Sequence, residues 1–148
     1  MKRILFSVIG MTMLMAVSQS EGLACTCGSS SGNLSIKQQV KEAQKQSRAV
    51  FVGKVMQVFQ QPDASGVLVK FRVEKSWKGR LTREVTVATG QGGGDCGYRF
   101  EVDDSYLVYA YGPNENSLGT NICQRTAALS EAGTDIKLLG KSKTLIKR

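Results

Sequence analysis

Apolar residues recur along the chain with two different periods. Over residues 67–75 every second residue is apolar, which is the pattern of a strand with one buried face. Trp77 and Gly79 are expected to end this strand. Between Ser35 and about Ser47 the apolar residues recur three or four positions apart, which predicts a helix that Ser35 caps. The apolar positions of this helix are Ile36, Val40 and Ala43.

Further strands are predicted where β-branched and aromatic residues cluster between turn signals. The strongest cover residues 105–111 and 49–59, and Gly53 in the latter predicts a bulge or bend. A second helix, capped by Ser130, is expected to reach Leu139. Shorter extended segments are expected over 84–89, 98–102 and 120–123. About five strands with two short helices predict one all-β domain, either a barrel or a small sandwich.

Two loop segments resemble reactive motifs without having their full pattern. Gly90–Gly94 is rich in glycine but lacks the Gly-Lys-Ser/Thr ending of a phosphate-binding loop, so we expect a flexible loop. Asp103 and Asp104 are adjacent in a predicted turn, where carboxylates usually point apart into solvent. Residues 60–66 contain proline, aspartate and glycine, which predicts a hairpin loop.

The first 24 residues have the organisation of a secretory signal peptide. Two basic residues precede an apolar run over 4–17, and the small residues Gly22 and Ala24 stand three and one positions before Cys25. The run is too short for a membrane-spanning helix. We therefore expect cleavage before Cys25, a secreted or periplasmic protein with no membrane span, a domain over 25–140 and a tail over 141–148.

Two other processing routes remain open. Cleavage before Gln19 is one of them. A lipoprotein signal would also cut before Cys25 and then acylate that cysteine. It normally has a large aliphatic residue at the position of Gly22, so a lipid-anchored protein is the less favoured alternative.

The chain contains no histidine. This excludes a Ser-His-Asp triad, a Cys-His pair and a histidine zinc site. It also removes imidazole, the usual general base near neutral pH. We therefore expect a protein that is not an enzyme and holds no cofactor of its own.

The formal net charge is +8, and it becomes +7 when Lys2, Arg3 and Glu21 are removed with the signal segment. A basic balance favours acidic partners, such as anionic glycans, a lipid surface or nucleic acid. The segment after Gly140 is basic, and we expect it to fray and to be available for contact with a polyanion. The cations of the C-terminal region, counted from the end of the second predicted helix, are Lys137, Lys141, Lys143, Lys147 and Arg148. Nucleic acid is disfavoured because aromatic residues are few and mostly occupy predicted core positions.

The four cysteines are even in number, and an exported chain forms disulfides by default. A bridge between Cys25 and Cys27 would close a very tight ring, which disulfide geometry disfavours. Each of these cysteines is therefore expected to pair with a distant one, Cys96 or Cys123, and both such pairings remain open. A four-cysteine zinc site is the rival, but its usual paired C-x-x-C motifs are absent.

The Cys25-Thr26-Cys27 start suggests either a covalent anchor for the chain end or a metal-binding edge. If cleavage makes Cys25 the first residue, its α-amine and its carbonyl oxygen can form a five-membered chelate ring with a metal ion. The amine must be unprotonated to bind metal, and its ordinary pKa of about 7.7–8.0 permits this near neutral pH. Disulfides at Cys25 and Cys27 would keep the chelating atoms rigid, which lowers the entropy cost of binding.

Five short motifs follow one another in a recognisable order. They are CTCG at 25–28, AVFVGKV at 49–55, SWKG at 76–79, CGY at 96–98 and NICQ at 121–124. In this order they resemble the N-terminal, netrin-like domain of the tissue inhibitors of metalloproteinases. The resemblance covers about Cys25 to Cys123, most of the predicted mature chain.

The resemblance implies a fold, a pairing of cysteines and a function. The fold is a five-stranded OB-type Greek-key barrel, and the bridges are Cys25–Cys96 and Cys27–Cys123. The function is inhibition of zinc metalloproteases: the amine and carbonyl of Cys25 would bind the target's catalytic zinc, and Thr26 would enter the adjacent pocket. The inhibitory contact would comprise Cys25, Thr26, Cys27, Gly28, Gly94, Asp95 and Cys96. The alternative is a non-inhibitory netrin-like module that binds an envelope protein or a polyanion.

Overall fold

The computed structural model describes residues 25–28, 33–61, 65–92 and 94–146. The predicted signal segment, residues 1–24, lies outside this part of the chain. The elements follow one another as α1 (Ile36–Gln46), β1 (Ala49–Gln60), β2 (Val67–Lys78), β3 (Glu84–Thr89), β4 (Ser105–Asn114), β5 (Ser117–Gly119), β6 (Ala127–Ala128) and α2 (Gly133–Leu139).

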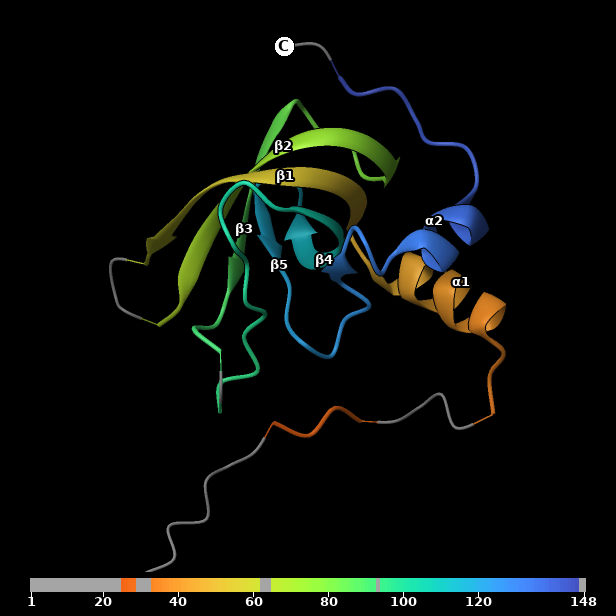
Figure 1. Ribbon diagram of the computed structural model, residues 1–148, viewed down its shortest axis with the longest axis horizontal. Coiled ribbons are helices and arrows are strands. Elements are labelled where there is room, and N and C mark those ends of the chain that lie inside the picture. Colours follow the sequence, from red (N-terminus) through yellow and green to blue (C-terminus); the bar gives the residue numbers. More distant parts are fainter. Residues whose placement is uncertain (1–24, 29–32, 62–64, 93, 147–148) are drawn as a thin grey trace, which may run out of the picture.

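Five of the strands close into a barrel. The strand order is β1-β2-β3-β5-β4, and β4 pairs in turn with β1. The pairing of β3 with β5 is parallel, and the other pairs that close the barrel are antiparallel. Figure 1 shows α1 and α2 side by side on one flank of the barrel. The structure confirms the expected all-β fold of OB-barrel type with short flanking helices.

The alternating pattern of β2 places one set of its side chains inside the barrel. Val69, Phe71 and Val73 are buried, whereas the intervening Arg72 and Glu74 are exposed. The ring of Phe71 packs edge-to-face against the ring of Phe100, and their centroids are 5.2 Å apart. The period of two in the sequence therefore arises because one face of β2 lines the barrel interior.

β1 and β4 are buried on both faces where they pair. Val50, Val52, Leu107 and Tyr109 point away from the barrel interior and form a second cluster with Trp77 and residues of α2. The helices cover this outer face. That cover explains why the start of β1 and the middle of β4 are continuous apolar runs rather than alternating ones.

Gly53 lies at a break in the pairing of β1 with β2, where the register shifts between Val52 and Gly53. A Cβ atom there would lie 3.1 Å from the Arg72 carbonyl oxygen and 3.2 Å from the Cβ of Phe71. The predicted bulge is confirmed, and glycine permits the close approach of the two strands.

Helix α1 begins where the sequence predicts. The Ser35 hydroxyl accepts the Gln38 N–H at 3.3 Å, and the Gln38 side chain accepts the Ser35 N–H at 2.9 Å, which completes a capping box. Val40 is buried, but Ile36, expected on the same buried face, is 49% exposed. Ile36 belongs to the first turn, which lies farther from the barrel than the end of the helix (Figure 1).

Several predicted boundaries are wrong for identifiable reasons. Trp77 does not end β2, because the strand continues to Lys78 while it pairs with β1, but Gly79 follows its last residue as predicted. The strand expected over 120–123 is instead Ser117–Gly119, and 98–102 contributes the buried Phe100 without forming a strand. Helix α2 begins at Gly133, not near Ser130, because Ala127 and Ala128 first pair with β4 and a turn follows them.

The segment after Gly140 was expected to fray, and its described part is instead attached to the barrel. The Lys143 N–H donates to the Ser76 carbonyl at 2.6 Å, and the Ile146 N–H donates to the Leu81 carbonyl at 3.0 Å. The Trp77 indole N–H donates to the Gly140 carbonyl at 2.7 Å.

Among the described residues, no helix is long and apolar enough to cross a membrane.

Candidate functional site at the disulfide-bonded N-terminal segment

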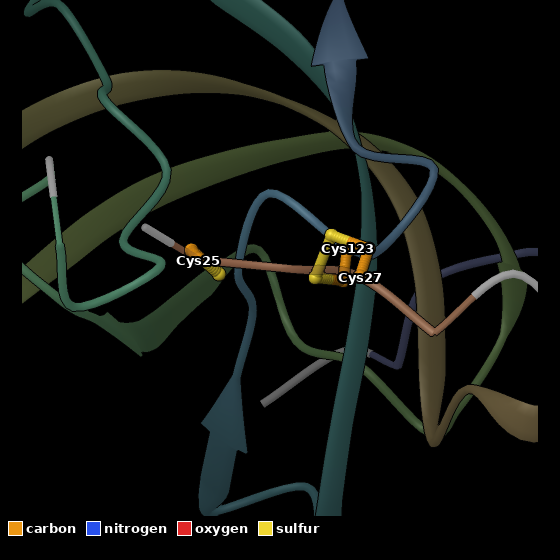
Figure 2. A group of neighbouring side chains, drawn as sticks. All are labelled: Cys25, Cys27 and Cys123. Atoms are coloured by element: carbon orange, nitrogen blue, oxygen red, sulfur yellow. A yellow bond between two sulfur atoms is a disulfide. The ribbon is translucent and has the colours of Figure 1, made fainter. Parts of the chain in front are cut away.

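Two disulfides join the N-terminal segment to the barrel. They link Cys25 to Cys96 and Cys27 to Cys123, with Cα–Cα distances of 5.3 Å and 5.2 Å. This is the pairing that the family resemblance implies. Figure 2 shows the Cys27–Cys123 bridge beside Cys25. The predicted anchor is therefore double, with one attachment on each side of Thr26.

The segment between the two bridges is presented to solvent. Thr26 and Gly28 are exposed, while Cys25 is half-buried against its partner loop. A Cβ atom at Gly28 would meet nothing within 4 Å. Because both neighbours of Thr26 are covalently attached to the barrel, the backbone there is fixed while its side chain stays accessible.

The sulfur atoms of Cys25, Cys27 and Cys123 lie within 4.8 Å of one another. Such a cluster is close enough for three thiolates to share one metal ion. Each of these sulfurs is in a disulfide, however, and there is no free cysteine among the described residues. A disulfide sulfur is not a thiolate ligand. The cluster follows from two bridges that start two residues apart.

The loop that carries Cys96 is organised around the carboxylate of Asp95. This carboxylate accepts the backbone N–H groups of Gln91, Gly92 and Gly97 at 2.5, 2.9 and 3.0 Å. The bonds from Gly97 and Gln91 hold the pKa of Asp95 below its usual range. The glycine-rich sequence predicts a flexible loop and gives no sign of this arrangement.

The close backbone packing of this loop requires glycine at position 97. A Cβ atom on Gly97 would collide with the backbone carbonyl of Gly90. Cys96 itself has a φ of 60°, in the left-handed region. The loop thus bends sharply at the disulfide, and the exposed Gly94 and Asp95 stand directly before the residue bonded to Cys25.

The sequence-predicted contact residues are therefore brought into one covalently connected region. Cys25–Gly28 is an irregular segment of this region, and Gly94–Cys96 joins it through the first bridge. Sequence reasoning missed Ile122, which is 47% exposed and whose N–H donates to the Cys96 carbonyl at 3.0 Å. Its position next to Cys123 was the available signal. We call Cys25–Gly28 with Gly94–Cys96 the N-terminal edge.

A largely buried polar network lies between β4 and the two helices. The Tyr109 hydroxyl donates to Asp135 at 2.9 Å, and Arg125 donates to both carboxylate oxygens at 2.9 and 2.7 Å. Arg125 also reaches Gln39 of α1 at 3.1 Å. Burial and the adjacent carboxylate raise the pKa of Tyr109, and Asp135 raises that of Arg125. The network is structural and joins both helices to β4.

Asp103 and Asp104, the adjacent acidic residues noted in the sequence, occupy a turn, as expected. Asp103 lies in the turn before β4 with a φ of 71°. Its carboxylate is paired with Lys54 at 2.9 Å, and its side chain is 80% exposed. This contact is a surface ion pair.

Asp95→Asn is expected to loosen the loop without unfolding the barrel. The amide keeps the shape of the side chain but replaces one of the acceptor oxygens with a donor group. Hydrogen exchange at the amides of Gln91, Gly92 and Gly97 should then accelerate, whereas amides of β1 should be unchanged. Unchanged exchange at all three loop amides would show that the carboxylate does not hold the loop.

The Asp95 carboxylate also makes the loop of the unaltered protein sensitive to pH. The pKa of Asp95 is lowered in the folded protein, so its stabilising effect is fully present above the ordinary aspartate pKa of about 3.9. It is lost as the pH falls through the lower folded value. Loop exchange, corrected for the intrinsic pH effect, should therefore increase only in that acidic range.

Comparison with known proteins adds no family assignment. No family model matches the sequence, and no curated protein matches it either. What the chain does is therefore inferred from its motifs and from the geometry described above.

Proposed function

We propose that this protein is an exported inhibitor of zinc metalloproteases that acts through its N-terminal edge. After removal of residues 1–24, the α-amine and carbonyl oxygen of Cys25 would bind the catalytic zinc of the target. Thr26 would enter the pocket beside that zinc, and Gly94 and Asp95 would contact the rim. The observation that carries this proposal is the exposed Thr26 held between two bridged cysteines.

Rigidity is the physical argument for inhibition. A flexible chain end that enters an active site loses conformational entropy and is easily displaced. Two bridges, at Cys25 and Cys27, remove most of that entropy before binding occurs. The bend at Cys96 and the hydrogen bonds to Asp95 stiffen the neighbouring part of the edge in the same way.

Binding of zinc requires that cleavage of the chain free the backbone nitrogen of Cys25. While residue 24 is attached, the nitrogen of Cys25 is an amide and has no lone pair to donate to zinc. Cleavage turns it into an amine that is neutral in part near pH 7.5. Bound to the target's zinc, it would displace the water that such enzymes activate for attack on substrate.

Adding one alanine before Cys25 is expected to weaken inhibition at least about 100-fold, which corresponds to about 2.8 kcal/mol. The added residue converts the zinc-binding amine into an amide. We would measure inhibition constants of the mature and extended proteins against a panel of zinc metalloproteases, after confirming each N-terminus by sequencing.

The matched control carries the same alanine after Arg148 and should inhibit as the mature protein does. Thermal unfolding of all three proteins should coincide, because the bridges are unaffected. Equal inhibition by the N-terminally extended protein would rule out chelation by Cys25. Absence of inhibition by the correctly processed protein against every protease in the panel would overturn the proposed function itself.

A further inference from the structure

A basic groove runs along the flank where α1, the end of β2 and the C-terminal segment meet. It consists of two neighbouring hollows of about 690 Å³ and 520 Å³. The two hollows share Lys45, Lys78 and Lys143 as lining residues. The cations that line the groove as a whole are Lys41, Lys45, Arg48, Lys78, Arg80 and Lys143.

The groove concentrates positive charge. Its six cations are offset by the two carboxylates of Glu42 and Glu115, so the lining carries a formal charge of +4. That is half of the +8 of the whole chain. Glu115 is already paired with Arg48 at 3.1 Å. Within the part of the chain that the structure describes, Lys41, Lys45 and Lys143 have no ion-pair partner.

Lys78, which lines both hollows, is held in place by hydrogen bonds. The Lys78 ammonium donates to the carbonyls of Gln44 and Lys45 at 2.9 and 2.7 Å, at the end of α1. Lys143 is brought to the groove by its backbone bond to Ser76. Because these cations sit on ordered backbone, binding an anion there requires little ordering of the chain.

The attachment of the C-terminal segment is what completes the groove. The sequence suggested that a frayed basic tail contacts a polyanion. Of the described cations in that region, Lys143 lines the groove, whereas Lys137 and Lys141 do not. Lys147 and Arg148 lie outside the described residues. The charge is thus gathered on one folded surface to which the segment contributes one lysine.

We propose that the basic groove binds an acidic polysaccharide. Two joined hollows with cations along both suit an extended chain of regularly spaced anionic groups. A single-stranded nucleic acid is the less suitable ligand, because such binding relies on exposed aromatic rings for base stacking. Trp77 is the aromatic residue in the lining, and it is 4% exposed with its N–H already donated to Gly140.

The groove shares no lining residue with the N-terminal edge. Polysaccharide binding therefore neither requires nor excludes inhibition, and this inference does not depend on the proposed function. A molecule with both activities would be retained on an anionic matrix while its N-terminal edge remains accessible.

The test compares binding of the full mature chain to heparin, to polygalacturonate and to a single-stranded DNA oligonucleotide at several salt concentrations. The groove variant is K41Q/K45Q/K143Q. The matched control, R72Q/R83Q/K137Q, removes the same charge from exposed positions outside the groove, and K137Q mirrors K45Q in the last turn of a helix. Thermal unfolding verifies that both variants are folded.

We expect the groove variant to bind heparin at least about tenfold more weakly near 0.1 M salt, with a salt dependence reduced by about two ions. The control should change affinity by less than about threefold. Binding of polygalacturonate as well as heparin would show that carboxylates suffice, and binding of heparin alone would show that sulfates are required. Equal losses in the two variants, no binding of either polysaccharide, or tighter groove-dependent binding of the DNA would each overturn the proposal.

Discussion

Replacing Cys27 and Cys123 together by alanine is expected to lower the free energy of unfolding by about 3.5 kcal/mol. With the Cys25–Cys96 bridge intact, the second bridge does not close its full sequence separation of 96 residues. It closes a circuit from Cys27 to Cys25, across the first bridge, and on from Cys96 to Cys123, about 30 residues in all. The chain-entropy model gives about 3.5 kcal/mol for a loop of that size.

The same circuit predicts that the two bridges are equivalent. Removing Cys25 and Cys96 instead opens the same circuit, although that bridge has a sequence separation of 71 residues. Urea unfolding of the two double variants should therefore give equal losses, and the variant without cysteines should lose about 8 kcal/mol in total. A loss below about 1 kcal/mol for either double variant would contradict the entropic account.

Asp135→Ala is expected to cost about 3 kcal/mol of unfolding free energy. The aspartate is 8% exposed and accepts hydrogen bonds from both Tyr109 and Arg125. Its removal leaves a partly buried guanidinium and a buried hydroxyl without that acceptor, which is more costly than losing one ordinary hydrogen bond. Urea or thermal unfolding measures the effect.

Two milder substitutions calibrate this prediction. Tyr109→Phe keeps the ion pair and should cost about 1 kcal/mol. Glu115→Ala breaks the solvent-screened pair with Arg48 and should be the least destabilising of the three substitutions. If Asp135→Ala were no worse than Glu115→Ala, the network would contribute nothing beyond a surface ion pair.

The strands that the sequence predicts well are those whose side chains meet one uniform environment on each face. β2 alternates because one of its faces lines the barrel, and β3 was predicted with its observed bounds. β5 and β6 are only three and two residues long, too short to produce a period. Their positions are determined by pairing with β4 and β3, which is information that no local pattern contains.

The candidate site likewise has residues that the sequence indicates and residues that only the structure reveals. The C-x-C motif and the later cysteines indicate which residues anchor the edge, because cysteine pairing has few solutions. The hydrogen bonds that the Asp95 carboxylate accepts depend on how its own loop bends, and the bond between Ile122 and Cys96 depends on how two loops lie against each other. The polar network joins Gln39, Tyr109, Arg125 and Asp135 from distant parts of the chain. Such long-range contacts cannot be deduced from sequence spacing.

The attached C-terminal segment also shields a strand edge. The pairing of β2 with β3 ends at Arg72 and Glu84, so β2 extends past its neighbour. Lys143 pairs with Ser76 on that stretch, and Ile146 pairs with Leu81 just beyond it. An uncovered strand edge is a template for pairing with other chains. A protein shortened at Gly140 would leave that edge open and would also lose the packing of Leu145 against the barrel core, so it would be prone to self-association through β2.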